Sequence, residues 1–187
     1  MDDGYFASMY RADPDPWGFD TRFYEQRKYD LTMAALPRSH YESGFEPGCS
    51  NGALTVRLAS RCATLASCDI VESAVERSRA RTSMLDHVHV EVARFPEQWP
   101  AGSFDLVVWS EVAYYLGDHS LDLAVRTLRE RLQPDGDLVV VSYTGSTNYP
   151  QTAASVDERI EQCDWLVRHT TLRSESFQLG VWRRRSA

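Results

Sequence analysis

The chain has 187 residues, 43% of them apolar and 25% charged, which suits one globular domain spanning residues 1–187 with a substantial core. The formal net charge of −7 repels phosphate and excludes nucleic acid as a substrate, and the four cysteines lack the spacing of a zinc site or a disulfide framework. The acidic start is not a signal peptide, and no apolar run reaches the ~20 residues of a membrane span, so we expect a cytoplasmic protein with no metal and no membrane partner.

The first third of the chain predicts two helices and two strands. Apolar side chains recur at helical spacing over 23–36, and Pro37 ends that helix. Phe45 is expected to open a short first strand, because residues 40–44 supply little apolar content. A helix over 53–61 and a second strand over 63–69 follow.

The middle of the chain continues the alternation of helix and strand. Residues 72–81 predict a helix, and a valine at every second position over 88–92 predicts a third strand. Residues 104–109 form a near-continuous apolar run, which is typical of a strand covered on both faces of a parallel sheet. This segment should be the central fourth strand.

The last third predicts two more helices and three strands. Apolar residues at steps of four, three and four from Leu121 to Leu132 predict a helix that ends at the Pro-Asp-Gly sequence of 134–136. The remaining expected elements are a buried fifth strand over 138–141, a helix over 153–162, an antiparallel pair of strands over 166–172 and 177–181, and a solvated basic strand end at 183–185.

Five alternations of strand and helix followed by a hairpin predict an open α/β sheet with helices on both faces. Ligands of such sheets bind beyond the carboxyl ends of the strands, where the strand order reverses. The segments at the carboxyl ends of the first four strands, at 48–52, 69, 93–94 and 110–111, should therefore converge on one site.

The most informative motif is Glu46-x-Gly48-x-Ser50-x-Gly52, followed 17 residues later by Asp69. Small residues keep Cβ atoms out of a tight turn, so that a ligand can lie against the backbone. An acidic residue after the next strand can accept the hydroxyl groups of a ribose. The spacing differs from the G-x-G-x-x-G that cradles a pyrophosphate, which argues against a dinucleotide cofactor.

This motif resembles motif I of class I S-adenosylmethionine-dependent methyltransferases, with Ser50 in place of the usual middle glycine. Residues 104–112 and 132–140 resemble the fourth-strand and fifth-strand signatures of the same enzymes, in the same order. The resemblance implies a Rossmann-like α/β fold with a mostly parallel seven-stranded sheet and a C-terminal antiparallel hairpin. It also implies S-adenosylmethionine as cofactor and S-adenosylhomocysteine as product.

Three further segments, at 15–17, 24–29 and 111–116, resemble the nodulation protein S (NodS-like) family, and this resemblance covers nearly the whole chain. Known members methylate the amino group of a glucosamine in a chitin oligosaccharide. The resemblance therefore implies a small-molecule acceptor, and N-methylation of an amino sugar or another amine. In such small methyltransferases the N-terminal segment, here 1–37, folds over the cofactor site.

The resemblance assigns cofactor roles to residues around the loop. Asp69 is expected to hold the ribose hydroxyls, Ile70 to pack on the adenine, and Glu46 to support the loop from behind, while Cys49 fills space. The same comparison directs Gly48, Ser50 and Gly52 toward the ribose and methionine parts of the cofactor. A competing interpretation of Asp69 is a helix-capping residue before residues 72–73.

Further cofactor contacts are expected from two other regions. Arg94, Phe95 and Ser110 follow the third and fourth strands, and Ala93-Arg94 stands where many relatives have an aspartate that reads the adenine amine. The carboxylate of the methionine part needs a donor from outside the loop. The candidates are Arg11, Tyr24 and Lys28, whose alternative role is to form the polar face of a helix.

Glu111, at the carboxyl end of the fourth strand, is the expected catalytic carboxylate. It would stabilise the charge that develops on an amine and remove its proton, or it would simply fix the loop. Tyr115 is expected to wall the methyl-transfer site, with Tyr114 and His119 contacting substrate. An O-methyltransferase with His119 or His40 as base, and a non-catalytic protein that binds S-adenosylmethionine or S-adenosylhomocysteine, remain open alternatives.

Overall fold

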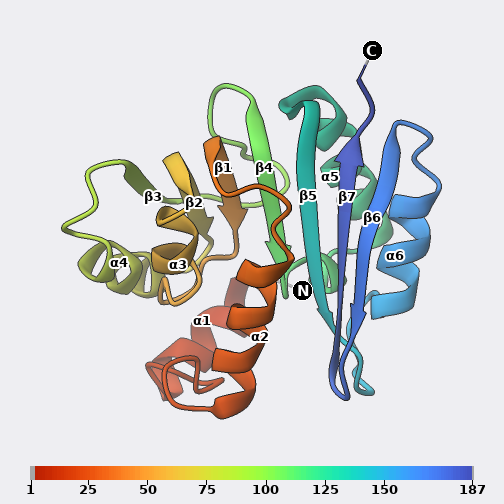
Figure 1. Cartoon of the computed structure of the whole chain (residues 1–187). Coiled ribbons are helices and arrows are strands. Elements are labelled where there is room, and N and C mark those ends of the chain that lie inside the picture. Colours follow the sequence, from red (N-terminus) through yellow and green to blue (C-terminus); the bar gives the residue numbers. More distant parts are fainter. Residues whose placement is uncertain (1–2, 187) are drawn as a thin grey trace.

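The computed structural model describes residues 3–186 and contains a seven-stranded sheet in the order β3-β2-β1-β4-β5-β7-β6 (Figure 1). The strands are β1 (Tyr41–Pro47), β2 (Cys62–Asp69), β3 (Val88–Val92), β4 (Phe104–Ser110), β5 (Leu132–Tyr143), β6 (Leu166–Arg173) and β7 (Phe177–Arg184). Strands β1 to β5 pair in parallel, and β7 pairs antiparallel with both β5 and β6. This confirms the predicted sheet and its closing hairpin.

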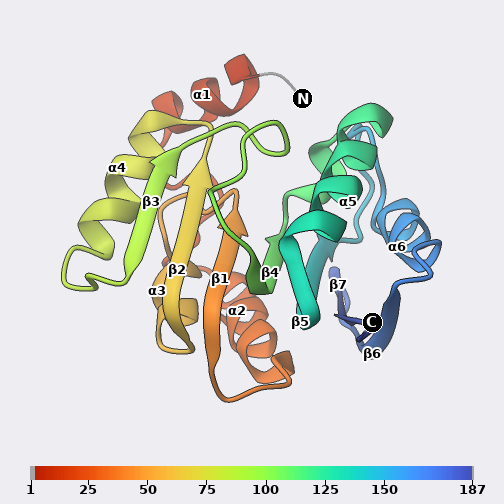
Figure 2. The same ribbon diagram turned by 90° about the horizontal axis from the view of Figure 1, so that it is seen from above.

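Helices cover both faces of the sheet (Figure 2). Strands β1 and β4 lie in the middle of the strand order. The helices are α1 (Asp3–Ala12), α2 (Phe23–Ala35), α3 (Thr55–Ala59), α4 (Glu72–Arg81), α5 (Asp118–Arg131), α6 (Ala153–Glu161) and the short 3₁₀ helix η1 (Ala113–Tyr115). Leu58 of α3 packs with Leu106 and Val139 on one face, while Leu128 of α5 packs with Val107 and Leu138 on the other. Successive side chains of β4 point alternately into these two cores. Both faces of the strand are therefore buried, which explains its continuous apolar run.

The first strand begins at Tyr41, so its predicted start at Phe45 was wrong. Tyr41 is buried, and the backbone N–H groups of Glu42 and Ser43 donate to the Asp105 carboxylate at 3.0 and 2.8 Å. A side chain of β4 thus supplies acceptors to the polar part of β1, which apolar periodicity cannot reveal. Helix α3 is also shorter than the predicted 53–61.

The fifth strand begins at Leu132, directly after α5, and not at the predicted 138. The register with β4 shifts between the Phe104–Leu132 pair and the Leu106–Asp137 pair, so the Pro-Asp-Gly sequence lies within an irregular part of the strand. Asp135 has a left-handed φ of 61° there. The signal for a helix end was correct, but the turn it predicted is an irregularity of β5.

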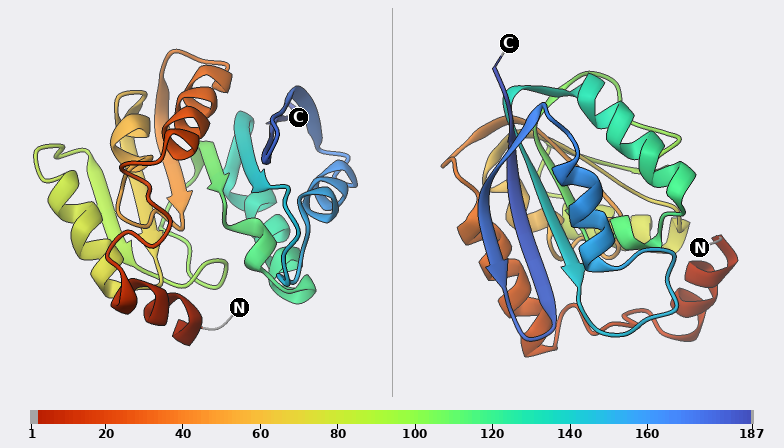
Figure 3. Two further views of the ribbon diagram at one scale, coloured as in Figure 1. Left: turned by 90° about the horizontal axis from the view of Figure 1, so that it is seen from below. Right: turned by 90° about the vertical axis from the view of Figure 1, so that its right-hand side faces the viewer.

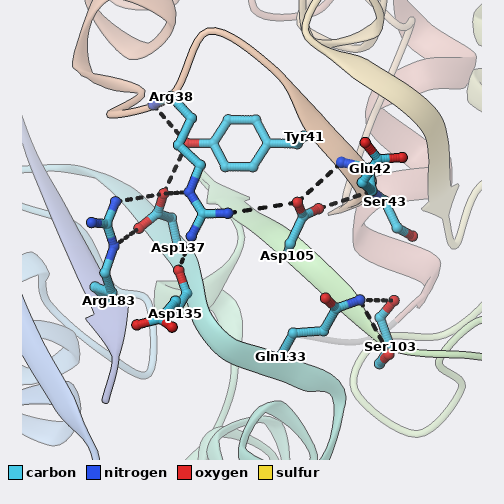
Figure 4. Close-up of polar contacts among 10 residues, drawn as sticks. All are labelled: Arg38, Tyr41, Glu42, Ser43, Ser103, Asp105, Gln133, Asp135, Asp137 and Arg183. Carbon is cyan, nitrogen blue, oxygen red and sulfur yellow. Dashed lines mark hydrogen bonds and ion pairs between the residues drawn. The ribbon is translucent and has the colours of Figure 1, made fainter. Parts of the chain in front are cut away.

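The basic run at 183–185 is more than a solvated strand end. Arg183 donates to both oxygens of the fully buried Asp137, at 2.8 and 3.2 Å, and Tyr41 donates to the same carboxylate at 2.9 Å (Figure 4). Arg38 lies 3.5 Å from Asp137. This charge network joins β1, β5 and β7 at the amino ends of β1 and β5.

Helix α1 and the loop after it were not predicted as ordered elements. They cross beneath the carboxyl ends of the central strands, and Phe6 of α1 packs against Tyr115 of η1 (Figure 3). Tyr10 of α1 packs with Val71 and Ala74 near the start of α4. A helix this short depends on such tertiary packing for its stability. None of the helices in residues 3–186 combines the length and the apolar character needed to cross a membrane.

Candidate functional site

A cavity of about 490 Å³ lies between the carboxyl ends of β1, β2 and β4 and the helices α1 and α2. This volume falls within the usual range for small-ligand sites. The predicted site residues that line it are Tyr24, Lys28, Glu46, Gly48, Cys49, Ser50, Asp69, Ile70, Arg94, Phe95, Ser110, Glu111, Tyr114 and Tyr115. The four chain segments that were expected to converge therefore do so.

Three predicted residues do not line this cavity. Arg11 is exposed at the end of α1, and His119 is exposed near the start of α5. Gly52 has a φ of 79°, and a Cβ there would meet Ser78 Oγ at 2.6 Å, so this glycine allows α4 to pack closely against the loop. His40, the other histidine considered as a base, is exposed just before β1 begins, at the opposite end of that strand.

The loop after β1 is held in a sharp bend by its backbone. Gly48 and Ser50 both adopt left-handed φ values, 72° and 51°. Gly48 is exposed to the cavity, and a Cβ at this position would lie 3.2 Å from Val112 Cγ2. Cys49 is buried beneath the loop, and burial raises the pKa of its thiol, which keeps it protonated and unreactive. The bend predicted from the sequence therefore forms, and it faces the cavity.

Asp69 closes this bend from the end of β2. Its Oδ2 accepts the backbone N–H of Ser50 at 3.0 Å, and its Oδ1 accepts that of Val71 at 3.0 Å. Burial raises the pKa of Asp69, while these backbone hydrogen bonds act in the opposite direction. Asp69 therefore fixes the loop and lines the cavity, while α4 begins after Val71 without a side-chain cap, so the helix-capping interpretation was wrong.

Glu46 supports the loop from within the protein. Its Oε2 accepts hydrogen bonds from Thr55 Oγ1 at 2.6 Å and from Ser67 Oγ at 3.1 Å. Burial raises the pKa of Glu46 to about 8, although these two hydrogen bonds lower it and the nearby Asp69 raises it further. The side chain is therefore largely protonated at neutral pH, as suits a structural group that is buried without a cation.

Tyr10 was missed by the sequence analysis, and it covers the loop from α1. Its hydroxyl is hydrogen-bonded to the Ser50 hydroxyl, and its ring is buried in contact with Trp17. Phe6, one turn earlier, also lines the cavity and packs edge-on against Tyr115 at 4.9 Å. The i, i+4 spacing of the two aromatic residues was the available signal, because it places both on one face of a helix.

A buried charge cluster forms another part of the cavity wall. The Lys28 ammonium lies 2.8 Å from Glu25 Oε2 and 3.6 Å from Glu111 Oε1, and the Lys28 side chain is only 2% exposed. Tyr114 donates a hydrogen bond of 2.6 Å to Glu111 Oε2. Glu111 has a left-handed φ of 59°, which is an uncommon conformation for glutamate and typical of strained functional positions.

The pKa of Glu111 is raised by burial, while the Lys28 ammonium and the Tyr114 hydrogen bond lower it. The Tyr114 ring lies 4.5 Å from that of Tyr115 and stacks at 5.5 Å on Tyr149, which the sequence analysis had not singled out. These rings make an aromatic wall beside the carboxylate, and burial together with Glu111 raises the pKa of Tyr114, which stays a hydrogen-bond donor.

Arg22 also lines the cavity and was not predicted. It precedes α2 as its N-terminal flanking residue, and it is exposed to solvent. It follows a polar, proline-rich segment without the apolar periodicity that would have predicted where its side chain lies. The structure alone brings this cation to the cavity, whereas Arg11 points elsewhere.

Comparison with known proteins agrees with this geometry. The family model described as nodulation protein S (NodS) matches residues 9–148. Nodulation protein S of Rhizobium tropici is 34% identical over 130 residues, a match that covers 68% of this chain and 55% of the relative. The chain spans 55 to 61% of the length of the three curated relatives with the longest matches.

Two solved structures share most of this fold. A Pseudomonas syringae protein described as a methyltransferase is 40% identical, with a TM-score of 0.77 over 87% of this chain and 100% of the other. The N-methyltransferase NodS of Bradyrhizobium japonicum, in complex with S-adenosylhomocysteine, is 26% identical, with a TM-score of 0.82 over 97% of this chain and 99% of the other. On these grounds the chain belongs to the nodulation protein S (NodS) family.

Proposed function

We propose that this protein transfers a methyl group from S-adenosylmethionine to an amine of a small molecule, such as an amino sugar. The observation that carries the proposal is the presence, in one cavity, of the Gly48–Ser50 bend with Asp69 and of the carboxylate of Glu111 beside an aromatic wall. NodS of Bradyrhizobium japonicum, described as an N-methyltransferase and crystallised with S-adenosylhomocysteine, supports the same assignment.

The residues of the loop suit the cofactor. Each oxygen of Asp69 accepts one backbone hydrogen bond, and a carboxylate has about four lone-pair sites, so acceptor capacity remains for the two ribose hydroxyls. Gly48 exposes its backbone to the cavity, and Ile70 and Phe95 offer apolar surface for an adenine. Arg22 is the cation that we assign to the methionine carboxylate.

The protein's contribution to the reaction is mainly positioning and charge. When bound, S-adenosylmethionine supplies the methyl group, and the amine lone pair forms the new N–C bond as the sulfonium C–S bond breaks. Glu111 takes the proton of the acceptor ammonium, which frees that lone pair and leaves the carboxyl group neutral, while the positive charge of the sulfonium passes to the methylated amine. Tyr114 fixes the carboxylate, while Tyr115 and Tyr149 shield the reacting groups from water.

Incubation with methyl-labelled S-adenosylmethionine and a panel of acceptors tests the proposal. The panel contains glucosamine, chitosan oligosaccharides and their hydroxyl analogues. We expect label on the amines. Transfer to hydroxyls alone contradicts N-methylation, and neither His119 nor His40 lines the cavity to serve such a reaction. Binding of S-adenosylhomocysteine without transfer to any acceptor indicates a binding protein.

Glu111→Gln separates chemistry from cofactor binding. We expect turnover to fall by about 10²–10⁴-fold, the usual contribution of a positioned acid or base. Affinity for S-adenosylhomocysteine, measured by calorimetry, should stay unchanged. Glu130→Gln on the exposed side of α5 is the matched control and should leave both quantities intact. Equal turnover in the two variants removes Glu111 from the mechanism.

Arg22→Ala tests the assignment of the methionine carboxylate. Loss of a charge-assisted hydrogen bond should weaken S-adenosylhomocysteine binding by about tenfold or more. Arg126→Ala, exposed on α5, is the control. If Arg11→Ala weakens binding more than Arg22→Ala does, the cation was assigned to the wrong residue.

A further inference from the structure

Lys28 is the only lysine in this chain, since the other members of its 20 basic residues are arginines. It is also the basic side chain that lies deepest among the described residues, at 2% exposure. Lysine carries a compact point charge, whereas arginine carries a broad planar one. The one lysine among these basic residues therefore occupies a buried position that lines the candidate site.

We propose that Lys28, held by Glu25, is a positioning residue that keeps Glu111 ionised and oriented for the acceptor amine. This inference rests on the proposed function, because it assigns to Lys28 a part in the action of Glu111. It differs from the role expected from sequence, in which Lys28 binds the carboxylate of the cofactor.

The geometry places Lys28 between two carboxylates. Glu25 and Lys28 are one turn apart on α2, so their side chains share a helix face, and that face meets the end of β4 at Glu111. The Lys28 ammonium also lies 5.1 Å from the ring centre of Tyr24 and 5.7 Å from that of Tyr29. These contacts hold the ammonium on the Glu111 side of the cavity.

The charges explain what the lysine accomplishes. Two carboxylates that share a dry site repel each other, and one of them takes up a proton unless a cation lies between them. Lys28 relieves this repulsion, because its ammonium lies within 4 Å of both carboxyl groups. The titratable groups that face Glu111 from α2 and η1 are Tyr24, Glu25, Lys28, Tyr29, Tyr114 and Tyr115.

Removal of the Lys28 ammonium should therefore favour the protonated form of Glu111 while the protein stays folded. A protonated Glu111 cannot accept a proton from the acceptor, so the lysine acts on the reaction through the carboxylate. A cofactor-binding lysine would behave differently, because its removal would weaken S-adenosylhomocysteine binding and leave Glu111 unchanged.

The first experiment measures the titration of Glu111 by carbon-13 NMR of protein labelled at the glutamate carboxyl carbons. Glu111→Gln identifies the signal. In Lys28→Met we expect the pKa of Glu111 to rise by about 1–3 units relative to the unmodified protein. Lys28→Arg retains the charge, so the pKa of Glu111 in this variant should lie nearer to that in the unmodified protein than to that in Lys28→Met. An unchanged titration of Glu111 in folded Lys28→Met overturns the proposal.

The second experiment uses the fact that the chain has one lysine. Labelling with [ε-¹³C]lysine gives a single resonance, which should shift with pH as the neighbouring carboxylate titrates. We expect this inflection to disappear in Glu111→Gln and to remain in the control Glu130→Gln. If the pH inflection of the lysine resonance is unchanged in Glu111→Gln, the two groups are not coupled.

Calorimetry with S-adenosylhomocysteine completes the test. We expect Lys28→Met to bind it within about threefold of the unmodified protein, and a tenfold loss with an unchanged Glu111 titration assigns Lys28 to the cofactor instead. Should Lys28→Met fail to fold, the double variant Glu25→Gln/Lys28→Met avoids the repelling pair and should raise the pKa of Glu111 in the same direction. The NMR readouts need no acceptor, so they stand even if the amine panel gives no product.

Discussion

Two buried charge clusters lie at opposite ends of the central strands and are built differently. At the amino end, Asp137 is fully buried, and both its oxygens receive hydrogen bonds from Arg183, with a further one from Tyr41 (Figure 4). Arg38 of the same network also lies 3.8 Å from Asp105. In this cluster every carboxylate oxygen of Asp137 has a partner within the described part of the chain.

The cluster at the carboxyl end is less complete. Glu111 Oε1 and Glu25 Oε2 are buried without a hydrogen bond from any residue in 3–186, and the Lys28 ammonium supplies their charge partner. Glu111 also adopts a left-handed backbone conformation. A saturated cluster stabilises the fold, whereas a cluster with spare acceptor capacity and strain is typical of a site that completes itself with a ligand.

The largest effect on stability is expected at the amino end. Asp137→Ala removes the buried acceptor of Tyr41 and Arg183 and one of the charge partners of Arg38, so the free energy of unfolding should fall by about 3–5 kcal/mol. Urea denaturation measures this loss. The control Gln133→Ala removes exposed bonds to Ser103 and should change stability by no more than about 0.5 kcal/mol. Similar losses in both variants would show that the Asp137 network does not stabilise the fold.

Glu46 should make stability depend on pH at the carboxyl end. Its pKa in the folded state, about 8, lies above the ordinary value of 4.5, so the folded state holds a proton that the unfolded state releases. The free energy of unfolding should therefore fall as pH rises from about 5 to 8, by a few kcal/mol. Glu46→Gln should flatten this part of a denaturation series, and a slope that survives the substitution assigns the dependence to other groups.

Glu111→Gly should cost much less stability than Asp137→Ala. Glycine adopts a φ of 59° without strain and Lys28 stays paired with Glu25, whereas Tyr114 loses its acceptor, so these effects largely cancel and we expect a change within about 1 kcal/mol. The same variant should lose turnover. A thermal melt and the labelled-methyl assay together decide the point. If Glu111→Gly loses as much stability as Asp137→Ala does, the contrast between the two clusters is wrong.

The smallest expected effect concerns the cover of the loop. Tyr10→Phe removes the hydroxyl that is hydrogen-bonded to Ser50 but keeps the ring that packs on Trp17. One neutral hydrogen bond within the protein contributes about 0.5–1.5 kcal/mol, so the free energy of unfolding should fall by about that amount. Urea denaturation checks this value. An unchanged free energy of unfolding in Tyr10→Phe would show that the hydroxyl does not stabilise the cover of the loop.

Much of the fold could be predicted because its signals are local. The helix α4 was predicted with its observed bounds, and the apolar run of β4 indicated a central strand, since both patterns depend on neighbours in the sequence. The polar start of β1 could not be predicted in this way. Its N–H groups are satisfied by Asp105, which lies more than 60 positions later in the chain.

The site divides along the same line. The sequence by itself determined the family resemblance, the sheet and the bend at 48–52 with Asp69, because a turn of small residues after a strand has few possible geometries. The tertiary structure alone decided that Tyr10 covers Ser50, that Arg22 and not Arg11 reaches the cavity, and that Lys28 faces Glu111. These contacts join α1 and α2 to strands far along the chain, and no local pattern specifies how separate elements pack.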